Sequence, residues 1–296
     1  MNVLGKIERV AEQLEAAGVA FGHGTTNAFD EAAWLVLWRL RLPLDADLFT
    51  PGHAGMRALA AAEQQAIDTL VGERIHTRRP AAYLTGEAWL QGVPFHVDER
   101  VIVPRSLIAE LIGDGTLEAW LGSHTQQVLD LCTGGGSLAV LAALAWPEVQ
   151  VLATDLSADA LAVAQLNIDR HELTERIHLA QGDGLAALHP GQRFDLVLCN
   201  PPYVNRRAMA ALPPEFQAEP AMALDGNAAG GSDGMDFIRS LLPALRPHLN
   251  EGALLVLEIG HEREHFLAAF RRLPVVWLPT SAGDDQVVLI EAAVLP

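Results

Sequence analysis

The sequence contains the stretch Phe194-Asp195-Leu196-Val197-Leu198-Cys199-Asn200-Pro201-Pro202-Tyr203, in which an apolar run of strand length ends at an asparagine followed by two prolines. A β-strand cannot continue through two prolines, because each lacks a backbone N–H and has a fixed φ. The residue before a proline is also restricted to extended conformations. The stretch therefore predicts that Asn200 ends a strand, at the edge where open α/β sheets bind ligands.

Two hydrogen-bond acceptors are adjacent at this turn, the carboxamide oxygen of Asn200 and the main-chain carbonyl of Pro201. Together they can hold both hydrogens of a planar –NH2 group, either in an amide or on a base ring. Such a nitrogen is a poor nucleophile because its lone pair is delocalised, and binding both N–H groups orients that lone pair. Pro202 and Tyr203 can pack against the flat group. The alternative interpretation is a turn that merely ends a strand.

From Gln126 onward, strand and helix patterns alternate, which predicts a parallel sheet. The first strand, 128–131, contains Asp130 and leads into a glycine loop with the sequence Cys132-Thr133-Gly134-Gly135-Gly136, followed by a helix over 137–145. Glycines there allow a ligand to approach the backbone and the helix N-terminus closely. The spacing does not match the pyrophosphate fingerprint, so the loop alone is weak evidence for a nucleotide.

Two aspartates, together with the glycine loop, indicate that the cofactor carries a nucleoside. Asp155 ends the second strand, about 20 residues beyond the glycine loop, where an acidic residue accepts hydrogen bonds from ribose hydroxyls. Its alternative role is to cap the helix that begins near Ser157. Asp183 follows the third strand and is placed to accept from an adenine amino group, unless it is only a turn aspartate.

The N-terminal part of the chain reads as three helices, the third over about 54–78. His23 lies between two glycines, so we expect it to be exposed, where it either touches a partner or is an incidental turn residue. A hairpin pattern over 83–103 leads to Arg105, which either contacts a ligand or substrate or has a surface role. We therefore expect a helical substrate-recognition domain over 1–85, a hairpin linker over 86–105 and a catalytic domain over 106–296.

The C-terminal part begins with a loop over 212–234 that is rich in proline, glycine and alanine, and loops of this length are usually functional covers or disordered. A helix over 235–249, a strand over 253–259 and a helix over 262–273 follow. Two adjacent terminal strands, 275–278 and 286–290, predict a final hairpin with one antiparallel strand. His261-Glu262-Arg263-Glu264-His265 matches a zinc-protease pattern, but no third histidine follows, so we expect a solvated helix start and no metal.

Composition limits the possible function. The 296 residues are 50% hydrophobic, enough for a substantial core, and the formal net charge is −17. This charge opposes a nucleic-acid substrate, whose phosphates need clustered Lys and Arg, but it suits a basic partner. The alternative is that acidity only serves solubility. With two cysteines and no targeting or membrane-spanning pattern, we expect a protein of the reducing cytoplasm, with no membrane partner.

The combination of the glycine loop with its preceding Asp130, of Asp155 and of the Asn-Pro-Pro-Tyr turn resembles the S-adenosylmethionine-dependent methyltransferases with a Rossmann-like sheet. The narrower resemblance, over nearly the whole chain, is to the protein N5-glutamine methyltransferases. It implies an α/β fold with a seven-stranded, mostly parallel sheet of the class I methyltransferase type, a small N-terminal helical domain and a connecting β-hairpin. Adenine-N6 DNA methyltransferases share the Asn-Pro-Pro-Tyr turn alone.

Two branches of this family methylate peptide-chain release factors or a large-subunit ribosomal protein. The bridge Pro104-Arg105-Ser106-Leu107-Ile108-Ala109-Glu110 and the segment Phe21-Gly22-His23-Gly24-Thr25 are similar to the ribosomal-protein branch. The resemblance implies transfer of a methyl group from S-adenosylmethionine to the N5 nitrogen of a glutamine in a basic ribosomal protein. The alternatives are a release factor, an adenine in nucleic acid, or a ribosome-assembly protein that binds the cofactor without turnover.

The resemblance also assigns residues to roles. The catalytic residues implied are Asn200, Pro201, Pro202 and Tyr203. The cofactor-binding residues implied are Asp130, Thr133, Gly134, Gly135, Gly136, Asp155, Asp183 and Asn200. The glycine loop would hold the methionine end of S-adenosylmethionine, Asp155 the ribose and Asp183 the adenine.

Overall fold

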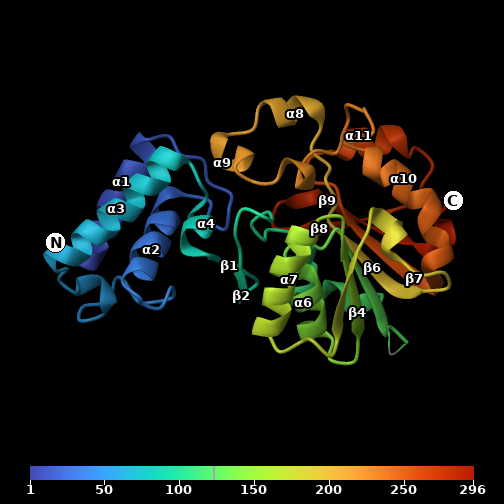
Figure 1. Cartoon of the computed structure of the whole chain (residues 1–296), viewed down its shortest axis with the longest axis horizontal. Coiled ribbons are helices and arrows are strands. Elements are labelled where there is room, and N and C mark those ends of the chain that lie inside the picture. The colour runs from blue at the N-terminus through green and yellow to red at the C-terminus, as the bar shows by residue number, and fades with distance from the viewer. Residues whose placement is uncertain (123) are drawn as a thin grey trace. The chain divides into compact units, whose positions relative to one another are not determined.

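The computed structural model describes residues 1–122 and 124–296, which form two compact units (Figure 1). The first unit comprises Met1–Ala88 together with Leu212–Glu219, and the second comprises Trp89–Ala211 together with Pro220–Pro296. The first is therefore assembled from two separate pieces of the sequence.

The first unit is helical. Its helices are α1 (Val3–Ala16), α2 (Ala28–Arg39), α3 (Ala61–Thr77), α4 (Ala81–Thr85) and the short α9 (Pro214–Gln217), with a 3-10 turn η1 at Ala54–Met56. Asn2 and Asn27 cap α1 and α2 by accepting from the N–H groups of Gly5 and Asp30. Apolar residues of α1, α2 and α3 pack into one buried core, which includes Ile7, Leu14 and Ile67.

The third helix begins later than the sequence predicts, at Ala61 instead of near Ala54. The reason is a backbone pairing with the N-terminus. The N–H of Val3 donates to the carbonyl of Arg57, and the N–H of Leu59 donates to the carbonyl of Met1. These bonds hold the chain extended just before α3, and apolar periodicity alone does not reveal them.

A buried charge cluster ties Leu212–Glu219 to the helices of the first unit. The guanidinium of Arg74, on α3, is fully buried and donates from Nε to Glu31 Oε1 at 2.8 Å and from Nη1 to Glu215 Oε1 at 3.2 Å. Arg78 donates to the same Glu215 oxygen at 3.1 Å. Because buried carboxylates are tolerated only when they are paired, this cluster fixes where the segment lies in the unit.

His23 is buried, with 2% of its surface exposed, so the prediction of an exposed turn histidine was wrong. Its ring packs against Phe216 at a centroid distance of 4.2 Å, and its Nε2 lies 3.4 Å from Glu219 Oε2. Gly22 and Gly24 both have positive φ, 121° and 99°, and turn the chain so that His23 faces inward. The covering residues come from far along the sequence, and the local pattern gives no sign of them.

The second unit is built on a seven-stranded sheet with the order β5-β4-β3-β6-β7-β9-β8. Its strands are β3 (Gln127–Leu131), β4 (Gln150–Asp155), β5 (Ile177–Gln181), β6 (Phe194–Cys199), β7 (Leu249–Glu258), β8 (Val276–Thr280) and β9 (Gly283–Glu291). The neighbouring strands in the part β5-β4-β3-β6-β7 of this order pair in parallel, whereas β9 pairs antiparallel with both β7 and β8. The predicted parallel sheet with a final antiparallel hairpin is confirmed.

Helices cover both faces of this sheet (Figure 1). Residues of α5 (Ile108–Gly113), α6 (Ser137–Ala145) and α7 (Ala158–Arg170) form one apolar core with the sheet, and residues of α10 (Asp236–Leu245) and α11 (Arg263–Ala269) form the other. Helix α10 ends earlier than predicted, because Pro247 follows in the 3-10 turn η5 (Arg246–His248). No helix in the described part of the chain is long and apolar enough to cross a membrane.

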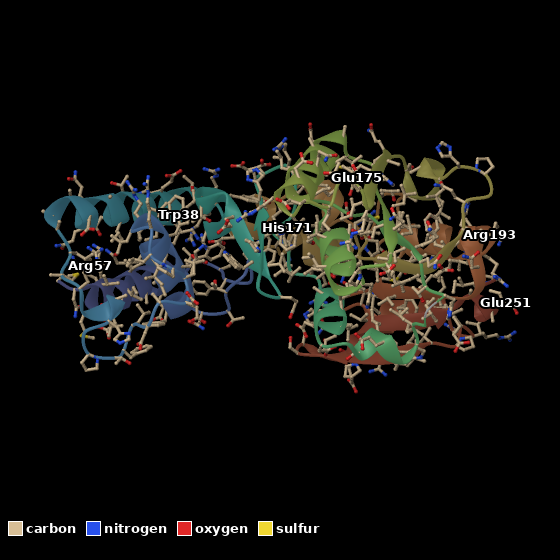
Figure 2. All side chains as sticks on the ribbon, turned by 90° about the horizontal axis from the view of Figure 1, so that it is seen from below. Trp38, Arg57, His171, Glu175, Arg193 and Glu251 are labelled. Carbon is tan, nitrogen blue, oxygen red and sulfur yellow. The ribbon has the colours of Figure 1, made fainter. Side chains whose placement is uncertain are left out.

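A hairpin of β1 (Glu87–Leu90) and β2 (Val93–His96) precedes the sheet, and β2 is fixed to α7. The buried Asn167 accepts from the N–H of His96 at 2.7 Å and donates to the carbonyls of His96 and Gly135. His171, labelled in Figure 2, makes a 2.8 Å hydrogen bond from Nε2 to the carbonyl of Pro94. One asparagine thus joins the hairpin to the glycine loop.

The segment predicted as a long loop, 212–234, contains short helical turns. Helix α8 (Arg206–Ala210) precedes it, α9 lies within it and a 3-10 turn, η4, spans Ala221–Ala223. The chain leaves the second unit after Ala211 and returns to it at Pro220. Residues 220–229 are called the strap below, because they run along the cavity described next.

Candidate functional site

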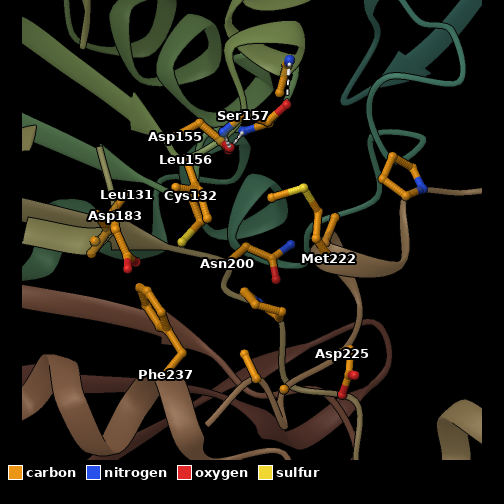
Figure 3. A pocket seen from close by; sticks show the side chains of 18 of the residues that line it. Leu131, Cys132, Asp155, Leu156, Ser157, Asp183, Asn200, Met222, Asp225 and Phe237 are labelled. Atoms are coloured by element: carbon orange, nitrogen blue, oxygen red, sulfur yellow. Dashed lines mark hydrogen bonds between the residues drawn. The ribbon is translucent and has the colours of Figure 1, made fainter. Parts of the chain in front are cut away.

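A cavity of about 560 Å³ lies at the carboxyl ends of β3, β4, β5 and β6 in the second unit (Figure 3). Strand order changes direction between β3 and β6, and such a switch point is where open α/β sheets bind ligands. Five of the residues predicted from the sequence line the cavity, namely Gly134, Asp155, Asp183, Asn200 and Pro202. The other six predicted residues do not line it, namely Asp130, Thr133, Gly135, Gly136, Pro201 and Tyr203.

The three glycines of the loop after β3 have different surroundings. At Gly134, with φ 55°, an added Cβ would meet no atom within 4 Å, so the backbone is open toward the cavity. At Gly136, with φ 80°, an added Cβ would lie 3.1 Å from the Cβ of Ala164, so this glycine allows the loop to pack on α7. Gly135 offers its carbonyl to Asn167. Only Gly134 is therefore placed for direct backbone contact with a ligand.

Asp130 supports the loop from beneath. Its Oδ2 accepts from the hydroxyl of Thr133 and, at 2.9 Å, from the N–H of Ala139, whereas its buried Oδ1 has no partner among the described residues. Burial raises the pKa of this carboxyl to about 7, against the opposing effect of the two hydrogen bonds. Asp130 and Thr133 thus brace the turn on which Gly134 lies.

Asp155 and Asp183 reach the cavity from neighbouring strand ends. Asp155 accepts from the N–H of Gly134 at 2.8 Å and from the N–H of Ser157 at 2.9 Å. A carboxylate has about four lone-pair sites, so two remain available for a ligand. The N-cap of α7 is Ser157, whose side chain accepts from the N–H of Ala160, so Asp155 is not the cap of this helix. Asp183 is exposed on the cavity wall, at the start of the 3-10 turn η3 (Gly184–Ala187).

The carboxamide of Asn200 points into the cavity (Figure 3). It forms no hydrogen bond with any other residue of 1–122 or 124–296. Apolar side chains of Leu156, Met222 and Phe237 line the same space. An unengaged amide in a largely apolar wall is suited to orienting a polar group of a ligand.

The side chain of Tyr203, at the end of the turn, is held by the buried Glu258. Its hydroxyl donates to Glu258 Oε1 at 3.0 Å, and the other oxygen of Glu258 accepts from the hydroxyl of Ser106 at 2.6 Å and from the N–H of Leu107 at 2.9 Å. Burial raises the pKa of Glu258, and burial together with the neighbouring Glu258 charge raises the pKa of Tyr203 well above its usual value. Glu258 therefore connects the bridge at Ser106 to the Asn-Pro-Pro-Tyr turn.

Comparisons with known proteins identify the family of this chain. Residues 114–227 match the family model of the methyltransferase small domain. The chain is 50% identical to the ribosomal protein uL3 glutamine methyltransferase of Bordetella pertussis, over 96% of this chain and 93% of that protein. It is also 50% identical to the enzyme of the same name from Burkholderia pseudomallei, over 98% and 94% of the two chains. The chain belongs to the ribosomal protein uL3 glutamine methyltransferase family.

A solved structure agrees on the fold alone. The hMettl16 catalytic domain, in complex with the MAT2A 3′UTR hairpin 1, superposes with a TM-score of 0.52 and 15% sequence identity, covering 88% of this chain and 89% of that one. Family membership makes the chain a methyltransferase, and the Rossmann-like, class I methyltransferase fold inferred from the sequence is confirmed.

Sequence reasoning about this methyltransferase missed several residues of the site. Met222 and Phe237 line the cavity, and Glu258 supports the turn, yet none follows a recognisable motif. The usable signal for Glu258 is a charged residue closing the otherwise apolar strand 253–257, because a charge in that position must be paired. The strap gives no comparable local signal.

Proposed function

We propose that this enzyme transfers a methyl group from S-adenosylmethionine to the side-chain amide nitrogen, N5, of a glutamine in ribosomal protein uL3. The observation that carries the proposal is the Asn200 carboxamide, which faces the cavity and has no hydrogen-bond partner among the described residues. The names of relatives at 50% identity, over nearly the full length of both chains, supply the substrate.

The cavity suits S-adenosylmethionine in size and lining. Its volume of about 560 Å³ is within the range of small-molecule sites, roughly 300–1,000 Å³. We propose that the open backbone at Gly134 holds the methionine end, that the free lone pairs of Asp155 accept from the ribose hydroxyls and that Asp183 accepts from the adenine amino group. When bound, S-adenosylmethionine supplies a methyl group on a positively charged sulfur.

The Asn-Pro-Pro-Tyr turn would bind and orient the glutamine. The side-chain oxygen of Asn200 and the carbonyl of Pro201 accept the two amide hydrogens, which fixes the nitrogen and favours localisation of its lone pair. Pro202, on the cavity wall, packs against the flat amide. The methylated nitrogen is cationic and strongly acidic, so it loses a proton to solvent without a strong base in the site.

The charge of the chain supports a basic substrate. A formal net charge of −17 attracts a cationic protein and repels a nucleic-acid backbone. An acidic enzyme of this family is therefore better matched to a ribosomal protein than to DNA or RNA, and such a substrate places the reaction in the cytoplasm.

The test uses isotope-labelled S-adenosylmethionine with separate candidate substrates: purified uL3, a release factor and duplex DNA that contains adenine. We expect label on uL3 alone, recovered as N5-methylglutamine after digestion and mass spectrometry. Label only on the release factor or the DNA would overturn the assignment. Binding of the cofactor without any label would favour the ribosome-assembly alternative.

A further inference from the structure

Two buried glutamates, Glu258 at the end of β7 and Glu262 at the start of α11, contact the Asn-Pro-Pro-Tyr turn and the residues after it. Glu258 is 4% exposed and Glu262, four residues later, is 6% exposed. Glu258 binds the hydroxyl of Tyr203, and Glu262 binds Asn205. Both ends of the short stretch 203–205 are thus held, one from the end of β7 and the other from the start of α11.

The contact between Glu262 and Asn205 is a double one. Glu262 Oε1 accepts from Asn205 Nδ2 at 2.6 Å and from the Asn205 backbone N–H at 3.3 Å. The other carboxylate oxygen of Glu262 contacts Nδ1 of His265. The motif that resembles a zinc-protease pattern therefore turns its glutamate toward the Asn-Pro-Pro-Tyr segment, and no group of three metal-binding side chains occurs in the described residues.

Asn205 lies where three parts of the site meet. Its Oδ1 accepts from the N–H of Ala208 and so caps α8. The residue before it, Val204, pairs with the strap, because its N–H donates to Leu224 and its carbonyl accepts from Gly226. Since Gly226 lines the cavity, a shift of Asn205 moves both the turn and the cavity wall.

The turn also has little room on this side. A Cβ added at Gly260 would lie 2.4 Å from the ring of Tyr203, and one added at Gly234 would lie 2.0 Å from the Tyr203 carbonyl oxygen. Backbone therefore packs directly on Tyr203 from two directions. With these walls in place, the hydrogen bonds to the two glutamates select one position of the turn.

We propose that Glu262 is a positioning residue for methyl transfer, which holds Asn205 and thereby fixes the acceptor pair of Asn200 and the Pro201 carbonyl. The proposal rests on the function proposed above for that acceptor pair. Glu262 touches neither cofactor nor substrate; it acts through Asn205. Displacement of a substrate-orienting group by about 1 Å can cost roughly 100-fold in rate, so loss of this contact should lower kcat.

The decisive variants are Glu262→Ala and Glu262→Gln, with Glu264→Ala as the matched control because Glu264 is exposed in the same motif. The alanine variant should lose about 10- to 100-fold in kcat, with the Kd for S-adenosylhomocysteine changed less than about threefold by calorimetry. The glutamine variant keeps an acceptor for Asn205 and should retain kcat within about threefold. The control should match the wild type.

A readout independent of activity is amide hydrogen exchange of the peptide that contains residues 199–206. Exchange there should speed up at least about tenfold in Glu262→Ala and remain unchanged in the control. If the wild type labels no glutamine but this exchange result holds, the proposed function fails while the positioning of the turn stands. Unchanged exchange together with unchanged kcat in Glu262→Ala would overturn the inference.

A second pair of variants covers the case in which Glu262→Ala does not fold. Asn205→Asp keeps the cap of α8 but removes the amide donor and places a carboxylate beside Glu262. It should lower kcat as the alanine variant does. Combining Asn205→Asp with Glu262→Gln exchanges donor and acceptor and should recover at least about tenfold of that loss. Absence of recovery would contradict a direct contact between the two side chains.

Discussion

The replacement Asp130→Asn tests the reasoning about the glycine loop through the pH dependence of stability. Asp130 is buried, and its folded-state pKa of about 7 lies above the ordinary value of 3.8. The stability associated with the protonated carboxyl is therefore complete below pH 3.8 and is lost as pH rises through about 7. The difference between these two pKa values corresponds to about 4 kcal/mol at full ionisation.

Most of this loss falls in an accessible range. Between pH 5 and pH 8, Asp130 alone should lower the free energy of unfolding of the second unit by about 2 to 3 kcal/mol. An asparagine stays neutral, and its oxygen can still accept from Thr133 and Ala139. Between pH 5 and pH 8, the free energy of unfolding should therefore fall less in Asp130→Asn than in the wild type. The difference between the two decreases should be about 2 to 3 kcal/mol.

The assay is urea unfolding at several pH values, followed by hydrogen exchange of peptides from β3 and β6, because a chain with two units need not unfold in one step. The control is Asp233→Asn. Hydrogen bonds from Arg239 lower the pKa of Asp233 to about 2, so its loss should change stability by a constant amount between pH 5 and pH 8. If the curves of the wild type and Asp130→Asn run parallel, the raised pKa and the supporting role argued from it are refuted.

Three further outcomes are expected. Asn200→Ala should lower kcat by at least about 100-fold while the Kd for S-adenosylhomocysteine changes less than about threefold; unchanged turnover would remove its proposed role. Arg74→Met should destabilise the first unit by about 3–5 kcal/mol in calorimetry, because the buried Glu31 loses its arginine partner and Glu215 keeps only Arg78, whereas Arg57→Ala, at a half-exposed pair (Figure 2), should cost less than about 1 kcal/mol. Gly234→Ala should impair turnover far more than Gly230→Ala, since both have positive φ but only Gly234 meets backbone atoms; equal effects would contradict the packing on the turn.

Local chemistry made much of the second unit predictable. Proline cannot continue a strand, so the end of β6 at Cys199 follows from the sequence. The apolar run after Gly136 marks α6, whose observed bounds, Ser137–Ala145, are those predicted. Parallel strands bring their carboxyl ends to one edge, which is why Gly134, Asp155 and Asn200 line a common cavity.

The parts that resisted prediction depend on contacts between distant residues. His23 is covered by Phe216 and Glu219, and no local pattern links residues almost two hundred positions apart. Glu262 reads as the start of a solvated helix until Asn205 is seen beside it. In both cases the sequence shows a polar side chain in a plausible surface position, and only the fold reveals its buried partner.

The composite make-up of the first unit has a consequence for proteolysis. Because Leu212–Glu219 belongs to it, the chain passes between the two units at three points: after Ala88, after Ala211 and after Glu219. A single cut after Ala88 leaves two fragments, and the larger one still contributes Glu215 to the Arg74 pair. Nicked protein should therefore migrate as one species under native conditions and separate only in denaturant.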